Sequence, residues 1–293
     1  MHKLLARMPI HETAVRPLPR LVRFLLLLWG TLMMLTTVTM ATWIVHDRRM
    51  PGWPSFLDRV KNGPVIDVAV GNVIVAVVCD ILLFACFGLV HLLSARRWTY
   101  VTISQRLKLV PQPALRTAFI TATAAAWVGL MLLWQPTSVL VFDLRPALSG
   151  IGIAASDVDK YGPLIPFMCM LLCWGTVFRH GALRFFGMRQ LVSPDKTNEI
   201  GEYLDGAKPK LVTTGEYRIV RHPMYTYLLA SVIVRPVLSL DLLVWFLSAI
   251  GFLIIALPYE EEKLVDKFGD SYREYQQRVP AFVPFWPHRR GSI

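Results

Sequence analysis

Residues 224–258 read MYTYLLASVIVRPVLSLDLLVWFLSAIGFLIIALP, an apolar run in which the only charged residues are Arg235 and Asp241. A helix needs roughly 20 apolar residues to cross the hydrocarbon core of a bilayer, so the run is longer than one crossing. Proline interrupts a helix, and Pro236 stands directly after the arginine. We therefore expect a tight pair of short helices whose turn contains Arg235, Pro236 and Asp241. Such a hairpin indicates a membrane protein.

The composition of the whole chain supports this interpretation. Of its 293 residues, 54% are hydrophobic and only 17% are charged, whereas soluble domains usually carry about 25% charged residues. With the hairpin counted as two, six spans are predicted in total. The other four are Leu21–Val45, Val65–Leu93, Pro113–Trp134 and Tyr161–Phe178. The predicted fold is an all-α, multi-pass integral membrane protein with about six transmembrane helices.

The distribution of basic residues predicts the orientation of the chain. With six spans, 24 of the 31 Lys and Arg residues lie on the side that carries both termini. The positive-inside rule places that side in the cytoplasm or its organellar equivalent. Basic loops that face anionic headgroups also account for the net charge of +11. We therefore predict membrane lipids as partners and no binding of nucleic acid.

The sequence does not decide which cellular membrane contains the protein. The basic N-terminal tail resembles a mitochondrial transit peptide, but it also fits an ordinary tail before a first span. An endomembrane, a bacterial inner membrane and a mitochondrial inner membrane are all compatible with it. The four cysteines lie inside predicted spans and form no CxxC pair in a loop, so no metal site is predicted.

Three Asp or His residues lie within the second predicted span: Asp67, Asp80 and His91. Asp80 and His91 are about three helical turns apart and share one helix face. Because ionisable groups inside a membrane are costly, they are functional candidates by default. They could line a ligand cavity between helices. Alternatively, Asp80 could pair with a neighbouring helix while His91 lies at the interface.

A basic cluster precedes the hairpin, and an acidic segment follows it. Arg218, Arg221 and His222 come directly before the apolar run, where basic side chains could also simply reach the headgroups. Glu260 and Glu261 come directly after it. Because a helical hairpin brings its two ends together, we expect Arg221, His222 and Glu261 to meet in one pocket suited to a zwitterionic ligand.

The C-terminal segment carries an apolar stripe. Its members recur at spacings of three and four residues, which predicts an amphipathic helix lying on the membrane or on other helices. They are Leu264, Phe268, Tyr272, Tyr275 and Val279.

Two motifs in this region resemble those of a known family. G-x-Y-R-x-V-R-H-P-x-Y begins at Gly215, and E-E-x-x-L-x-x-x-F-G-x-x-Y-x-x-Y-x-x-x-V-P begins at Glu260. Together they resemble the C-terminal core of the isoprenylcysteine carboxyl methyltransferase superfamily. Upstream, His91, Gln135-Pro136 and FGMRQ at Phe186–Gln190 look like the branch of methanethiol S-methyltransferases, nurim and NnrU-like proteins. The implied domains are a basic tail with the first span at 1–60 and a methyltransferase-like domain at 61–293, with its cofactor core at about 213–285.

The resemblance implies a membrane-embedded methyltransferase that uses S-adenosylmethionine and acts on a small thiol or a lipid-borne acceptor. Methyl transfer from a sulfonium is an in-line displacement that needs orientation and exclusion of water, so no catalytic acid or base is predicted. Asp80 and His91 are the candidates for the acceptor side. The implied cofactor-binding residues are Tyr217, Arg218, Arg221, His222, Tyr225, Glu260 and Glu261.

Two departures from the family pattern keep alternatives open. The family usually has glycine where this chain has Tyr227, and its Gln-His-Ser is here Val90-His91-Leu92. One alternative is a non-catalytic protein, either nurim-like or an accessory subunit of a membrane or mitochondrial complex. Another is a haem-binding, NnrU-like isomerase with His91, His180 or His222 as axial ligands, although its branch generally lacks the acidic motif.

Overall fold

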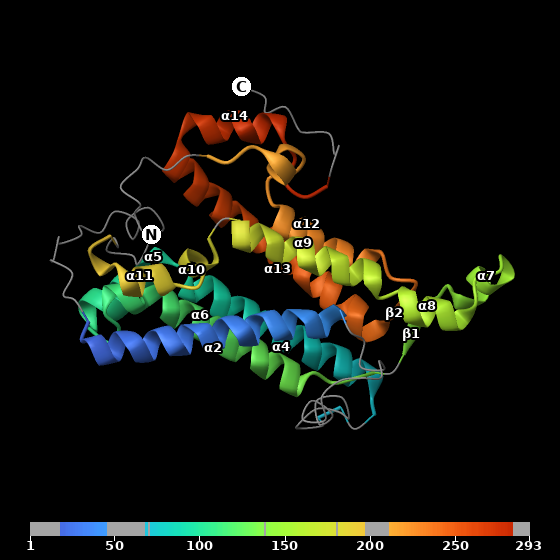
Figure 1. The fold of residues 1–293 in the computed structure, drawn as a ribbon. Helices are drawn as coiled ribbons and strands as arrows, with labels where there is room; N and C mark the ends of the chain where they lie inside the picture. Colours follow the sequence, from blue (N-terminus) through green and yellow to red (C-terminus); the bar gives the residue numbers. More distant parts are fainter. Residues whose placement is uncertain are drawn as a thin grey trace. The chain divides into compact units, whose positions relative to one another are not determined.

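The computed structural model describes residues 18–45, 68–69, 71–137, 139–179, 181–196 and 211–283. Helices dominate this part of the chain, as expected of an all-α protein (Figure 1). The chain divides into two compact units. The first comprises Met1–Met40, Leu82–Leu133 and His180–Ala207. The second comprises Ala41–Ile81, Trp134–Arg179 and Lys208–Ile293. The predicted axial ligand His180 and most of the predicted N-terminal domain lie outside the described residues.

Helices that are far apart in the sequence build the first unit. Its helices are most of α2 (Arg20–Val45), the later part of α4 (Val73–Ser94), α5 (Arg97–Val101), α6 (Leu115–Leu133), α10 (Ala182–Phe185) and α11 (Met188–Val192). A π-helical turn, Thr102–Arg106, follows α5. Trp29 Nε1 on α2 donates to Thr121 Oγ1 on α6 at 2.8 Å.

The FGM motif in this unit requires its glycine. Gly187 has a φ of +83°, and a Cβ there would lie 2.9 Å from the backbone nitrogen of Thr117. Only glycine fits such a close approach in a left-handed conformation. The neighbouring Phe186 and Leu191 are fully buried. The motif therefore has a packing role in this unit.

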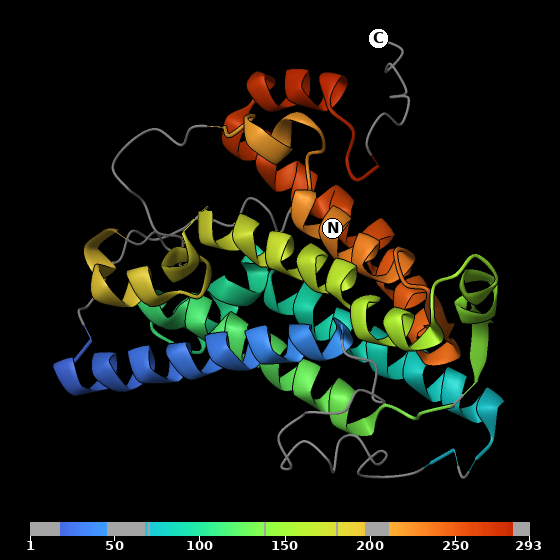
Figure 2. The ribbon, with the colours of Figure 1, turned by 45° about the vertical axis from the view of Figure 1, so that its right-hand side comes forward.

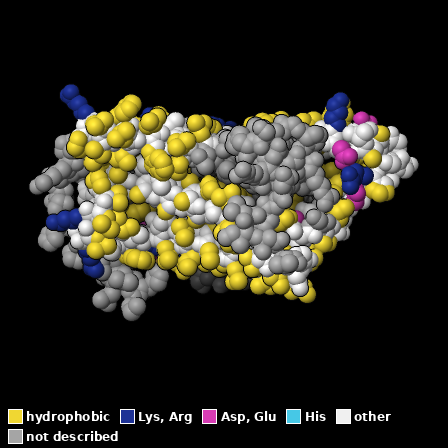
Figure 3. Space-filling view, turned by 90° about the horizontal axis from the view of Figure 1, so that it is seen from below, with side chains coloured by type: hydrophobic (Ala, Val, Ile, Leu, Met, Phe, Trp, Pro, Cys, Tyr) yellow, Lys and Arg dark blue, Asp and Glu magenta, His cyan; other side chains and the backbone are white. Residues whose placement is uncertain are grey.

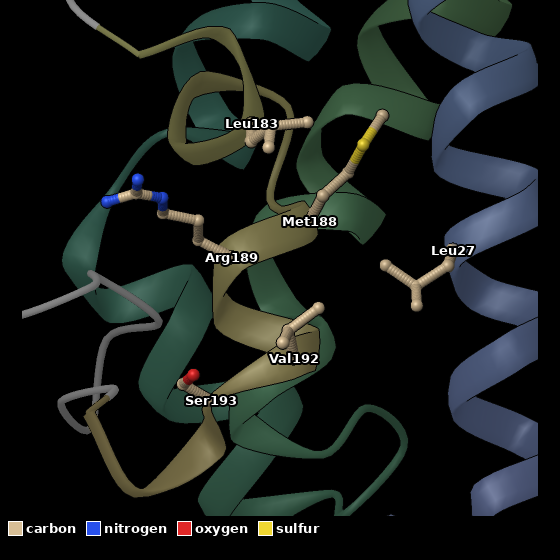
Figure 4. Close-up of a pocket in the computed structure, with 6 residues that line it drawn as sticks. All are labelled: Leu27, Leu183, Met188, Arg189, Val192 and Ser193. Carbon is tan, nitrogen blue, oxygen red and sulfur yellow. The ribbon is translucent and has the colours of Figure 1, made fainter.

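The first unit also contains a cavity of about 370 Å³. In Figure 4, Leu27 on α2 points toward Met188 and Val192, while Arg189 extends away from Leu27. Leu183 and Ser193 complete the lining.

The second unit contains the predicted helical hairpin. Its elements are β1 (Leu140–Asp143), α7 (Arg145–Gly150), α8 (Ala155–Tyr161), α9 (Leu164–Arg179), α12 (Pro223–Ile233), β2 (Val237–Ser239), α13 (Leu240–Phe268) and α14 (Asp270–Arg278). Helix α12 lies along α9 and beside α13 (Figure 2).

The turn of the hairpin lies where the sequence predicted it. Strand β2 pairs antiparallel with β1, and Asp241 Oδ1 accepts from the backbone nitrogen of Thr137 at 2.9 Å. The two helices differ in length, however. Helix α12 has 11 residues and rises about 16 Å, too little to cross a bilayer alone, whereas α13 has 29.

Two predicted boundaries were wrong. The second span begins at Val73 instead of Val65, because the Asn72 side chain caps the helix by accepting from Ile74 N and Val75 N at 3.0 and 3.1 Å. The stripe from Leu264 to Val279, predicted to lie on one helix, in fact spans two: α13 continues through Pro258, and the break comes at Gly269, with a φ of +62°. Proline is tolerated in helices of membrane proteins.

Among the described residues, four helices are long and apolar enough to cross a membrane. They are Val73–Ser94, Gln112–Leu133, Ala155–Arg179 and Leu240–Phe268. Helices α2 and α12 occupy the positions of the other two predicted spans. In Figure 3, hydrophobic side chains cover much of the described part of the face shown. The protein is thus an integral, multi-pass membrane protein, and the count of six spans stays a prediction.

Candidate functional site

The second unit brings the basic and the acidic motif into direct contact. Arg221 Nε and Nη2 donate to the two carboxylate oxygens of Glu261 at 2.8 and 3.0 Å. His222 Nε2 lies 2.8 Å from Oε1 of the same carboxylate. The three predicted residues therefore meet, because α12 begins and α13 ends its apolar part at the same end of the hairpin.

Further donors fill the remaining positions on Glu261. Tyr272 Oη donates to Oε1 at 3.1 Å, and Gln276 Nε2 donates to Oε2. Tyr272 and Gln276 lie four residues apart on α14, so they share one helix face. Charge-assisted hydrogen bonds of this kind are the strong ones in proteins. Glu261 is therefore the centre of an internal network, and both of its oxygens are engaged.

The same cluster holds the segment that follows α14, which we call the C-terminal strap (Val279–Phe282). Arg221 Nη1 donates to the carbonyl of Val279, and the backbone nitrogen of Arg221 donates to Pro280 at 2.8 Å. His222 N donates to Ala281 O at 3.0 Å, and Thr226 Oγ1 donates to Phe282 O at 2.8 Å. Four successive carbonyls of the strap are thus held at the start of α12.

The other predicted glutamate has a different environment. Glu260 Oε2 accepts from Tyr225 Oη at 2.8 Å. The Tyr225 ring stacks on His222, with centroids 5.8 Å apart, and Phe282 contacts both rings. Glu260 Oε1 accepts no hydrogen bond from the residues that the structure describes. This part of the cluster combines an aromatic surface with an available carboxylate oxygen.

Tyr217 lies in a short turn, Gly215–Arg218, that is fixed by α14. Tyr275 donates its hydroxyl to the carbonyl of Tyr217. Burial raises the pKa of Tyr275 to about 12. Burial, with a smaller contribution from the Glu216 carboxylate, also raises the pKa of Tyr217 to about 12. Both phenols therefore stay protonated at neutral pH. Arg218 in the same turn is exposed.

Tyr227 replaces the glycine expected from the resemblance, and it faces a different side of α12 from Tyr225. Two positions along a helix correspond to a rotation of about 200°. Glu260 binds the hydroxyl of Tyr225. The Tyr227 side chain therefore points away from the contact between Tyr225 and Glu260.

The two predicted acceptor-side residues belong to different units. Asp80, in the second unit, accepts from the backbone nitrogen of Gln135 at 2.8 Å, and Gln135 Oε1 accepts from Val68 N at 3.0 Å. Asp80 thus helps to fix the chain after α6. A cavity shared with His91 stays a prediction.

His91, in the first unit, has an aromatic environment. Its Nδ1 lies 3.4 Å from Thr123 Oγ1. The rings of Phe119 and Phe87 lie 5.2 and 6.1 Å away, and Trp127 contacts Phe87 at 5.0 Å.

Comparison with known proteins gives matches to methyltransferases. The chain is 26% identical over 228 residues to the methanethiol S-methyltransferase of Pseudomonas deceptionensis, covering 74% of this chain and 76% of that protein. It is 26% identical over 223 residues to the methanethiol S-methyltransferase of Mycobacterium tuberculosis, covering 73% and 80%.

A shorter segment matches more closely to a plant protein. Over 84 residues it is 43% identical to protein-S-isoprenylcysteine O-methyltransferase B of Arabidopsis thaliana, covering 26% of this chain and 40% of that protein. No protein-family model and no solved structure matches the chain.

Proposed function

Because the chain belongs to the isoprenylcysteine carboxyl methyltransferase superfamily, we propose that it is an integral membrane methyltransferase that uses S-adenosylmethionine. One observation carries this proposal: two polar motifs, separated by the hairpin, join in one cluster at the end of apolar helices. The methyl acceptor we propose is a small thiol or a lipid-borne group, because the relatives are named for substrates of these kinds.

The residues of the cluster fit the chemistry of such a donor. S-Adenosylmethionine presents a carboxylate, an ammonium, ribose hydroxyls, an adenine and a sulfonium. Glu260 supplies a carboxylate oxygen for the cationic groups or the ribose, and Arg218 an exposed cation. The rings of Tyr225 and Phe282 offer an aromatic surface, and aromatic faces bind both flat rings and cations.

We assign two roles within the predicted set of cofactor residues. Arg221, His222 and Glu261 form a frame, since their polar groups already bond one another and the strap. The proposed contacts with the donor are the other members of the set, Tyr217, Arg218, Tyr225 and Glu260. A rigid frame lowers the cost of holding the reacting groups in line.

The bound donor would supply an electrophilic methyl group on its sulfonium. The chain itself would orient that group and exclude water, and neither role needs an acid or a base from the protein. On the acceptor side we propose His91, whose aromatic environment suits an apolar thiol or lipid. Asp80 stays the second proposed residue, although its carboxylate already holds Gln135 N.

The haem alternative has less support. His222, one of its proposed axial ligands, is buried and pairs through Nε2 with Glu261. A non-catalytic role remains the main competitor, and binding experiments separate it from the enzyme.

Calorimetry with the full-length protein in detergent tests the proposal. We expect S-adenosylmethionine to bind in the micromolar range, and transfer of a labelled methyl group to a short alkanethiol or to an isoprenylated thiol to identify the acceptor. Absence of binding at millimolar donor would contradict the proposal and favour the non-catalytic role.

A further inference from the structure

The carboxylates around the cluster differ in what they can still bind. Both oxygens of Glu261 are engaged by Arg221 and its neighbours. Glu260 uses only Oε2, which accepts from Tyr225. Glu216 uses only Oε1, which pairs with Arg179 Nη2 at 2.6 Å. Among the described residues, Glu260 Oε1 and Glu216 Oε2 therefore have no hydrogen-bond donor.

The Glu216–Arg179 pair joins the turn before α12 to the last residue of α9. The Glu216 side chain is only 12% exposed, whereas that of Arg179 is 57% exposed. An ion pair with one open partner contributes little to stability. It does, however, present a largely buried carboxylate next to a guanidinium that is more than half exposed.

Tyr217 links this pair to the rest of the cluster. It directly follows Glu216 in the turn Gly215–Arg218. Its carbonyl is held by Tyr275 on α14. The turn that carries Glu216 is therefore tied to α14, whose Tyr272 and Gln276 bind Glu261.

An adjacent cation and anion are the complement of an α-amino acid. Guanidinium binds a carboxylate through paired, charge-assisted hydrogen bonds, and a carboxylate binds an ammonium. Arg221 and Glu261 have this same pairing of types, but their groups already bond each other and the strap. Because Arg179 is 57% exposed, the Glu216–Arg179 pair keeps capacity for a ligand that the Arg221–Glu261 pair has lost.

We propose that Arg179 and Glu216 bind the amino-acid end of the methyl donor, Arg179 its carboxylate and Glu216 its ammonium. This assignment rests on the proposed function. It adds two residues to the donor site and leaves Glu260 to the ribose or the sulfonium.

Calorimetry with three ligands tests the two proposed contacts, Arg179 with the carboxylate and Glu216 with the ammonium, separately. S-Adenosylmethionine carries both charged groups, decarboxylated S-adenosylmethionine keeps only the ammonium, and 5′-methylthioadenosine has neither. We expect Arg179→Gln to weaken binding of the first ligand about tenfold and to leave the other two unchanged. We expect Glu216→Gln to weaken the first two about tenfold and to leave methylthioadenosine unchanged.

A matched control uses another exposed ion pair in the same unit. Arg273 Nη1 and Asp270 Oδ1 are 2.8 Å apart on α14, and Arg273→Gln or Asp270→Asn should leave binding of all three ligands unchanged. Retained binding of methylthioadenosine shows that each variant is folded.

The outcomes of this experiment distinguish failure of the proposed function from failure of the assignment of Arg179 and Glu216. Wild-type protein that binds no S-adenosylmethionine overturns the proposed function and, with it, this assignment. Wild-type protein that binds the donor, with Arg179→Gln and Glu216→Gln binding it equally well, overturns the assignment alone.

Discussion

Arg221 and Glu261, 40 residues apart in the chain, form a two-bond ion pair in which Nε and Nη2 lie 2.8 and 3.0 Å from the two carboxylate oxygens. Each side chain is only 12% exposed. The pair fixes the end of α13 to the start of α12, and through Arg221 Nη1 it also holds the carbonyl of Val279 in the strap. It is therefore a structural frame as well as part of the candidate site.

We expect Glu261→Ala to destabilise the protein by about 3 kcal/mol, because it leaves Arg221 with an uncompensated, largely buried charge. The double variant Arg221→Met/Glu261→Met should be more stable than Glu261→Ala, since it removes both charges together. Unfolding in detergent micelles measures both. Glu262→Ala, at the exposed next position, is the control and should be nearly neutral. Equal stability of Glu261→Ala and Glu262→Ala would show that the network contributes nothing to folding.

The break between α13 and α14 depends on Gly269. Its φ of +62° and ψ of −136° lie in a region that is nearly restricted to glycine. Gly269→Ala should cost about 2 kcal/mol of stability and loosen the contacts of Tyr272 and Gln276 with Glu261. Gly251→Ala, within α13 and with nothing near its Cβ position, is the matched control and should be neutral or slightly stabilising. If both variants melt at the same temperature, the break is not under strain.

The apolar stripe packs largely on itself. Tyr272, Tyr275 and Val279 form a buried cluster, against which Phe268 and Leu211 are packed. Phe268→Asp should therefore destabilise the protein by about 2 kcal/mol, through loss of apolar burial. Lys267→Asp places the same charge at the exposed preceding position and should have little effect. An unchanged melting temperature for Phe268→Asp would show that the segment is loosely attached.

The meeting of Arg221 with Glu261 was predictable because a helical hairpin must bring its flanking residues together. The stripe was also correctly identified, but its helix was not. The spacing of Phe268 and Tyr272 is the same whether the helix continues or bends at Gly269, so periodicity alone could not reveal the break. The ion pair between Glu216 and Arg179 depends on the packing of α12 along α9. Nothing local in the sequence marks that packing.

The sequence prediction also missed several polar partners, because their contacts likewise depend on how distant segments pack together. Tyr272 was assigned to the stripe for its ring, and its hydroxyl bond to Glu261 became visible only in the structure. Gln276 follows it by one helical turn, which is a signal that could have been used. Thr226 binds the strap carbonyl of Phe282 from within an apolar helix, a contact between segments that no spacing rule connects.

The last prediction concerns Tyr227, where the family pattern has glycine. The ring lies on the side of α12 away from Tyr225, so we expect it to leave the surface formed by Tyr225, Phe282 and Glu260 open. Tyr227→Gly should lower stability by about 1 kcal/mol, because glycine weakens a helix interior, and should not tighten donor binding. Tyr227→Phe, which keeps the ring and removes only the hydroxyl, is the control and should bind the donor with nearly wild-type affinity. A tenfold gain in affinity in Tyr227→Gly would instead mean that the ring occupies space the donor needs, and would favour a protein that no longer methylates.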